Sequence, residues 1–104
     1  MNSTVLVVGN KKVTLKYTRK MPRGEVERMK SFVAKNGDKL IKTSKFKSFI
    51  AKSQVTVGMS EKEILLSWGA PDRFMTRQGF DKVAVYTIKD VLIYYKNNKA
   101  VKIL

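Results

Sequence analysis

This sequence contains no cysteine and no histidine among its 104 residues. Without cysteine the chain has no disulfide, no thiol nucleophile and no thiolate ligand for zinc. Without histidine it lacks the usual general base near neutral pH. Its acidic residues number only eight, and Glu61 and Glu63 lie two positions apart, a spacing that does not bring carboxylates together on a helix. We therefore expect a protein that is not an enzyme and that holds no metal or cofactor.

Long hydrophobic runs are also absent. No stretch of about 20 apolar residues occurs, so the sequence predicts no membrane span. The segment 1–9 has no basic part, and its apolar run is too short for a secretory signal. We therefore expect a cytoplasmic protein.

Acidic residues are outnumbered by basic ones, with 22 Lys and Arg against 8 Asp and Glu, and the formal net charge is +14. The excess is uneven, because residues 1–54 carry 14 basic and 3 acidic residues whereas residues 55–104 carry 8 and 5. Such an imbalance indicates an acidic partner: a nucleic acid, an anionic lipid or an acidic protein surface. We expect a single domain over residues 1–104, since the basic part alone would be marginally stable.

Residues 57–72 predict a short helix whose two ends are both specified. Ser60 is a favourable N-cap, and Glu63 three residues later completes a capping box. Gly69 stands where a left-handed residue ends a helix, and Pro71 prevents its continuation. Trp68 belongs to the apolar face and is expected to anchor the helix against a sheet. The residues expected to have this structural role are Gly58, Ser60, Glu63, Trp68, Gly69 and Pro71.

The same stretch carries a family resemblance. Gly-Met-Ser-x-x-Glu, an apolar pair and Trp-Gly-x-Pro-Asp are followed by strands with an Asn-containing turn, and this pattern resembles small proteins of the BamE (SmpA/OmlA) type. Relatives of that family share the fold of the β-lactamase inhibitor proteins. The matching residues lie in the second half of the chain and are Gly58, Met59, Ser60, Glu63, Leu65, Leu66, Trp68, Gly69, Pro71, Asp72, Tyr86, Tyr94, Tyr95, Asn98 and Ile103.

The resemblance implies an assembly factor or inhibitor that binds proteins through its sheet face and loops. The contact regions would be residues 73–77, residues 78–82 and the Asn97–Asn98 turn. The implied contact residues are Arg73, Arg77, Phe80, Lys82 and Asn97. Lipoprotein members of this family carry an N-terminal cysteine that this sequence lacks, so the alternative to a cytoplasmic protein is the mature part of a bacterial envelope lipoprotein without its signal and anchor.

The basic half predicts a β-hairpin followed by helices. Two β-rich runs on either side of a turn at residues 9–12 predict strands over residues 4–8 and 13–18. Apolar and polar residues alternate in the second run, so one face of that strand should be buried. Helical spacing predicts one helix over residues 25–35, ended by Asn36-Gly37. A second helix is expected over residues 38–52, with Asp38 as N-cap; its apolar residues form no single stripe, which suggests a bend near Thr43-Ser44.

The second half predicts an antiparallel meander. Strands are expected over residues 73–77, 82–88, 91–96 and 100–104, and Asn97-Asn98 suits the turn of the last hairpin. The fold class is therefore α+β, with two to three short helices and a three- or four-stranded antiparallel sheet. Whether the N-terminal hairpin joins this sheet stays open.

A set of six lysines, which we call the lysine ridge, is the main candidate surface. If helix runs through this region, Lys35, Lys39 and Lys42 follow one another at i, i+4 and i+7, and Lys45 and Lys52 continue the series. The full ridge is Lys35, Lys39, Lys42, Lys45, Lys47 and Lys52. The alternative interpretation is a solvated face that only maintains solubility.

We expect a non-catalytic protein-binding module that recognises an acidic protein surface. The alternative is nucleic-acid binding, in which the lysine ridge would contact phosphates. A platform for base stacking could be formed by Tyr86, Tyr94 and Tyr95. However, Tyr94 and Tyr95 are adjacent in a strand and must point to opposite faces of the sheet. Packing in the sheet explains them more simply.

Overall fold

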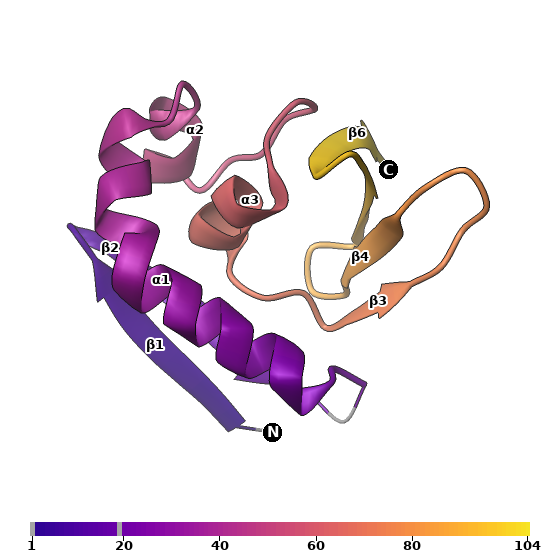
Figure 1. The fold of residues 1–104 in the computed structure, drawn as a ribbon, viewed down its shortest axis with the longest axis horizontal. Helices are drawn as coiled ribbons and strands as arrows, with labels where there is room; N and C mark the ends of the chain where they lie inside the picture. The colour runs from indigo at the N-terminus through magenta and orange to yellow at the C-terminus, as the bar shows by residue number, and fades with distance from the viewer. Residues whose placement is uncertain (1, 19) are drawn as a thin grey trace.

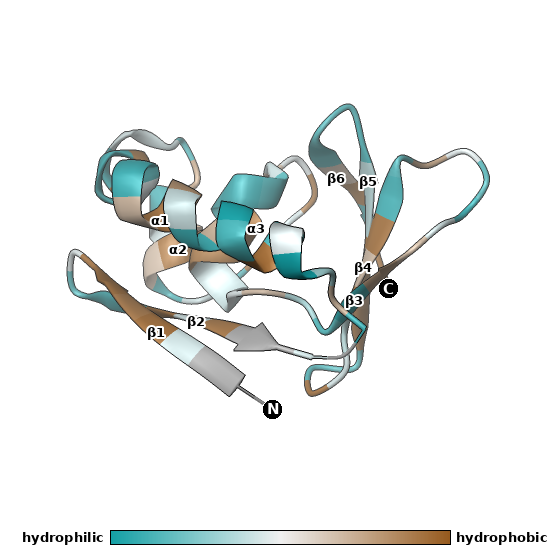
Figure 2. Ribbon diagram, turned by 60° about the horizontal axis from the view of Figure 1, so that its bottom comes forward, coloured by the Kyte–Doolittle hydropathy of each residue, from teal (hydrophilic) through white to brown (hydrophobic). Residues whose placement is uncertain are grey.

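Three helices pack against a two-stranded hairpin on one side and face a four-stranded antiparallel sheet on the other (Figures 1 and 2). The computed structural model describes residues 2–18 and 20–104. The α+β class predicted from the sequence is confirmed, and the C-terminal sheet has four strands. Among the described residues, the hairpin and the four-stranded sheet are separate sheets.

The hairpin consists of β1 (Asn2–Val8) and β2 (Lys11–Tyr17), which pair in antiparallel register with Val8 opposite Lys11. Gly9 in the turn has φ +61°, a value that glycine adopts without strain. Val13 and Leu15 are buried, whereas Val7 on the opposite face of the hairpin is 70 % exposed. The predicted hairpin is confirmed, with one buried face and one face open to solvent.

The first helix is longer than predicted. α1 (Arg23–Thr43) is continuous, so the predicted end at Asn36-Gly37 and the new start at Asp38 are wrong. Gly37 is buried in this helix, and a Cβ added there would lie 3.0 Å from Val8 Cγ1. Glycine therefore lets α1 approach β1 closely, and this tertiary packing outweighs its weak helix propensity.

The helical region breaks at Ser44, where the bend was predicted. The backbone of Ser44 is extended, its N–H donates to the carbonyl of Leu40, and its hydroxyl accepts from the N–H of Phe46. A separate short helix, α2 (Lys47–Ala51), follows. The single helix predicted over residues 38–52 is therefore wrong, because Ser44 and its hydrogen bonds end α1.

The central helix α3 (Glu61–Trp68) has the predicted capping box. The hydroxyl of Ser60 accepts from Glu63 N at 3.1 Å, and the Glu63 carboxylate accepts from Ser60 N at 2.8 Å. At the other end, Gly69 has φ +81°, and a Cβ there would lie 2.2 Å from the carbonyl oxygen of Thr14 in β2. Only glycine permits this approach of the helix end to the hairpin.

Both flanks of α3 are attached to the four-stranded sheet by backbone hydrogen bonds. Gly58 N donates to the carbonyl of Ala100 at 2.8 Å on one side. Asp72 N donates to the carbonyl of Val85 at 2.8 Å on the other side, directly after the buried Pro71. The helix is therefore held between the hairpin and the sheet.

The sheet runs in the order β3 (Arg73–Met75), β4 (Lys82–Tyr86), β5 (Val91–Lys96) and β6 (Lys99–Ile103). The first two strands are shorter than predicted, so Arg77 and Ile88 lie outside them. Asn97 and Asn98 have φ +54° and +64°, as expected for the turn of a tight hairpin. The register between β5 and β6 shifts at Tyr94/Tyr95.

The core joins the helices to the inner face of the sheet. Met59, Ile64 and Leu66 are fully buried around α3 and belong to one cluster with Ile93 and Ala100. Within the described residues, no helix combines the length and apolarity that crossing a membrane requires; α1 has 21 residues but many are charged.

Trp68 occupies a less central position than the sequence predicted. It is only partly buried, although its ring packs edge-on against Tyr86 of the sheet with centroids 5.2 Å apart. Its indole N–H donates to the carbonyl of Ser53 at 2.9 Å. Ile64 and Leu66 supply the fully buried contacts of α3.

Candidate functional site

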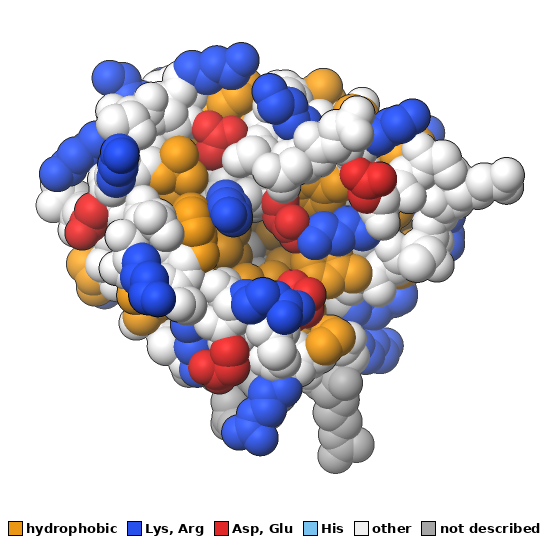
Figure 3. Space-filling model, in the orientation of Figure 1, with side chains coloured by type: hydrophobic (Ala, Val, Ile, Leu, Met, Phe, Trp, Pro, Cys, Tyr) orange, Lys and Arg blue, Asp and Glu red, His pale blue; other side chains and the backbone are white. Residues whose placement is uncertain are grey.

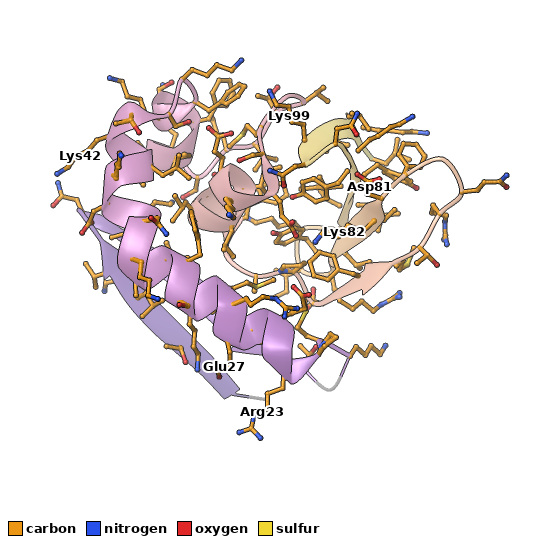
Figure 4. The ribbon with its side chains drawn as sticks, in the orientation of Figure 1. Arg23, Glu27, Lys42, Asp81, Lys82 and Lys99 are labelled. Atoms are coloured by element: carbon orange, nitrogen blue, oxygen red, sulfur yellow. The ribbon has the colours of Figure 1, made fainter. Side chains whose placement is uncertain are left out.

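All six lysines of the lysine ridge are exposed. Because α1 is continuous, Lys35, Lys39 and Lys42 lie along one stripe of it, and Lys42 projects away from the body of the protein (Figure 4). The predicted continuation of the series to Lys45 and Lys52 at the same helical spacing is wrong, because α1 ends at Thr43. The remaining ridge lysines are carried by the turn after α1 and by the residues of α2 and its C-cap.

The ridge lysines form no ion pair within the described part of the chain. Among the described residues, ion pairs join Arg28 to Glu25, Lys30 to Glu27 and Lys82 to Glu61, and none involves a ridge lysine. Lys45 lies over the ring of Phe46, 5.2 Å from its centroid. Apart from the electrostatic interaction of Lys45 with Glu63, the positive charge of the ridge is therefore not neutralised by the described residues.

Glu63 is the acidic group most affected by its surroundings near the ridge. Burial alone would raise the pKa of its carboxyl, but hydrogen bonds from the hydroxyl of Ser44, from Ser60 and the charge of Lys45 outweigh burial and lower that pKa. Glu63 is thus an ionised structural group that links α3 to the end of α1, and not a free acid.

A hollow of about 280 Å³ lies between α1, α3 and the inner face of the sheet. Its walls include Phe32 from α1, Leu65 from α3, and Phe74 and Ala84 from the sheet. Apolar atoms are visible at the centre of this face, between basic and acidic side chains (Figure 3). The arrangement combines an apolar interior with a charged rim.

The rim charges are largely paired with one another. Lys82 projects from β4 (Figure 4), its Nζ lies 2.7 Å from the Glu61 carboxylate, and it also lies over Phe74, 4.5 Å from the ring centroid. Arg28 pairs with Glu25 on α1, and the Nζ of Lys62 lies 5.0 Å from the ring centroid of Phe32. Within the described residues, no three acidic side chains gather closely enough to hold a metal ion.

Two tyrosines at the base of the hollow differ in their hydrogen bonds. The hydroxyl of Tyr86 donates to the carbonyl of Gly69 at 2.8 Å. Tyr95 is 2 % exposed, and its hydroxyl has no hydrogen-bond partner among the residues that the structure describes. Burial raises the pKa of both phenols, with Glu61 adding to the effect, so both are neutral donors at physiological pH.

The structure does not bring the five predicted sheet-loop residues together on one face of the sheet. Phe80 packs edge-on against Tyr94 on the outer face, with ring centroids 4.8 Å apart, whereas Lys82 faces the hollow. The Asp81 carboxylate accepts from Asn97 N at 2.7 Å, so the loop of Phe80 and the Asn97 turn lie together. Arg77 is exposed, and Arg73 alternates with Phe74 and so shares the outer face.

Sequence reasoning missed the hollow. Its apolar walls have the same helical and strand spacings as a core, and no local signal distinguishes a core residue from one beside an open hollow. The adjacent pair Tyr94 and Tyr95 was the available clue, since one of them had to face the helices, and Tyr95 does.

Comparisons of the chain with protein-family models, with curated proteins and with solved structures found no match.

Proposed function

We propose that this domain is a non-catalytic binding module that recognises an acidic surface of a partner protein through the lysine ridge. The observation that carries this proposal is the set of six exposed lysines that form no ion pair among the described residues. Lys35, Lys39 and Lys42 follow one another along α1, where like charges repel each other. An acidic partner would relieve that repulsion and attract the domain over long range.

The composition of the ridge favours a protein over a nucleic acid. It contains lysine only, whereas base recognition relies on arginine and on exposed aromatic rings. Tyr86 and Tyr95 are buried in the core, and Phe46 and Phe49 pack on each other with ring centroids 6.1 Å apart. These aromatic rings therefore pack against other side chains of the protein and are not arranged as a platform for base stacking.

The resemblance to BamE-type proteins supports the same class of function. In that interpretation the loop of Phe80 and the Asn97 turn, joined through Asp81, form a second contact region for a protein partner. The fold class agrees with such a role but hosts many others, so the assignment as an assembly factor or inhibitor stays a proposal.

A second candidate function is binding to nucleic-acid phosphates. It is favoured by the single stripe of Lys35, Lys39 and Lys42 on α1, which can track a charged backbone without reading its sequence. Such binding would be independent of sequence and strongly weakened by salt.

The test compares a ridge variant with a charge-matched control. Lys39, Lys42 and Lys45 are changed to Glu in the ridge variant. In the control, Lys12, Lys20 and Lys89, which are exposed and lie outside both the ridge and the second contact region, are changed to Glu. Each tagged protein is used to capture partners from a lysate treated with nuclease. We expect one stoichiometric protein with the wild type and the control and its loss with the ridge variant.

Direct binding of labelled single- and double-stranded nucleic acid at about 50 and 200 mM salt tests the second candidate. If the affinity for nucleic acid falls by about a thousandfold between these salts and the ridge variant does not bind, the partner of the ridge is a nucleic acid and not an acidic protein. Equal loss of protein capture in both variants would contradict a specific role of the ridge.

A further inference from the structure

The hydroxyl of Tyr95 indicates a second candidate site, separate from the lysine ridge. A buried hydroxyl without a hydrogen bond is unfavourable, and proteins rarely retain one. Among the described residues, every side-chain nitrogen or oxygen that is fully enclosed has a partner. Since the Tyr95 hydroxyl has none, it must touch open space, and the open space that Tyr95 lines is the hollow between α1, α3 and the sheet.

The walls of the hollow suit an aromatic ring. Phe32 and Leu65 come from the helices, and Phe74 comes from the sheet, so apolar side chains are present on both sides. Aromatic rings gain from burial against apolar side chains and from edge or offset contacts with other rings. The walls of the hollow are therefore apolar, and the Tyr95 hydroxyl provides one polar contact at its base.

The rim indicates that the polar end of the occupant is uncharged. Lys82 is paired with Glu61, and Arg28 is paired with Glu25, so the charges on the two sides of the hollow largely cancel. A cation buried beside these pairs would find no carboxylate outside them among the described lining residues. An anion would find only Lys62, an exposed side chain that already lies over the ring of Phe32. A neutral hydroxyl needs only the hydroxyl of Tyr95, which can donate to it or accept from it.

The size and openness of the hollow favour a side chain of a larger partner. At about 280 Å³ it is at the small end of the range of roughly 300–1,000 Å³ that is typical of small-molecule sites. It opens on the face seen in Figure 3, where its apolar floor is visible between charged groups. A free small molecule would leave one side in water, whereas a partner polypeptide would cover its own anchored side chain.

We propose that the hollow binds a tyrosine side chain of a partner polypeptide, with its ring between Phe32, Leu65 and Phe74 and its hydroxyl bonded to that of Tyr95. This deepens the proposed function, on which it rests in taking the partner to be a protein. The anchor would add specificity to an interaction that the lysine ridge makes electrostatically.

The experiment titrates the full chain with N-acetyltyrosinamide and with N-acetylphenylalaninamide, which differ by one hydroxyl, and follows backbone amide signals by NMR. We expect both probes to shift signals of residues that line the hollow, and the tyrosine probe to bind about two- to tenfold more tightly. Tyr95→Phe should abolish that preference while still binding both probes. The matched control Tyr94→Phe makes the same chemical change on the opposite face of the sheet and should keep the preference.

Absence of shifts around the hollow with either probe would overturn the proposal, as would an unchanged preference in Tyr95→Phe. Because both probes are neutral, the result does not depend on the lysine ridge. The variant with Lys39, Lys42 and Lys45 changed to Glu should bind them like the wild type. Failure of the acidic-partner proposal and failure of the tyrosine site would therefore appear in different measurements.

Discussion

The carboxylate of Asp38, in the C-terminal half of α1, accepts a hydrogen bond from the backbone N–H of Gly9 at 2.9 Å. The two residues are 29 positions apart, and the bond attaches the turn of the hairpin to the helix that packs on it. The N–H of Gly9 in the turn thus has an acceptor, and Asp38 is the one acidic residue in a region otherwise rich in lysine.

Replacing Asp38 by Ala should lower the free energy of unfolding by about 1 kcal/mol, because the N–H of Gly9 loses its acceptor. Glu27→Ala is the control: it removes one negative charge from the same helix, but Glu27 forms only an exposed ion pair with Lys30 at 3.6 Å. That control should change stability by less than about 0.5 kcal/mol. Urea unfolding measures both, and equal losses would show that charge alone is responsible.

Gly69 and Gly79 form a second matched pair, since both have positive φ, +81° and +88°. Alanine at either position strains the backbone by about 1 kcal/mol or more. At Gly69 the added Cβ would also lie 2.2 Å from the Thr14 carbonyl oxygen, whereas at Gly79 nothing lies within 4 Å. Gly69→Ala should therefore be the more destabilising change by several kcal/mol and Gly79→Ala the milder one. Similar midpoints in thermal unfolding would contradict the close approach of α3 to β2.

The features that could be predicted from the sequence are those determined by neighbouring residues. The capping box needs only Ser60 and Glu63, and the turn at Asn97-Asn98 needs only two residues that accept positive φ. Both were predicted correctly, because the hydrogen bonds or dihedral angles concerned depend on residues at most three apart.

The features that could not be predicted depend on distant residues. Asn36-Gly37 has the local signal of a helix end, but Gly37 is buried against Val8, a contact that the local sequence does not reveal. The hollow is likewise assembled from Phe32, Leu65 and Phe74, which come from three different elements. Only the topology decides that these side chains face an open space and not a closed core.

Loss of the hydroxyl group should lower the stability of the protein at Tyr86 but not at Tyr95. Tyr86→Phe leaves the carbonyl of Gly69 without its donor in a buried position and should cost about 1 kcal/mol of stability. Tyr95→Phe removes a hydroxyl that has no partner among the described residues, so stability should stay the same or rise slightly. Denaturant unfolding distinguishes the two. A clear loss in Tyr95→Phe would mean that its hydroxyl is bonded in solution and would argue against an unfilled site.

The pKa of Glu63 predicts how stability depends on pH. Its carboxyl has a lowered pKa in the folded protein, so over the interval between the folded and unfolded pKa values the unfolded chain binds more protons and stability rises with pH. The contribution is complete above the unfolded pKa, about 4.3, and is lost as pH falls through the folded value. Glu63→Gln retains the size of the side chain and lacks this titration. The stability difference between wild type and Glu63→Gln should therefore be largest near pH 7 and shrink as pH is lowered below about 4. A difference that stays constant over this range in urea unfolding would show that the Ser44 and Ser60 hydrogen bonds do not favour the ionised form.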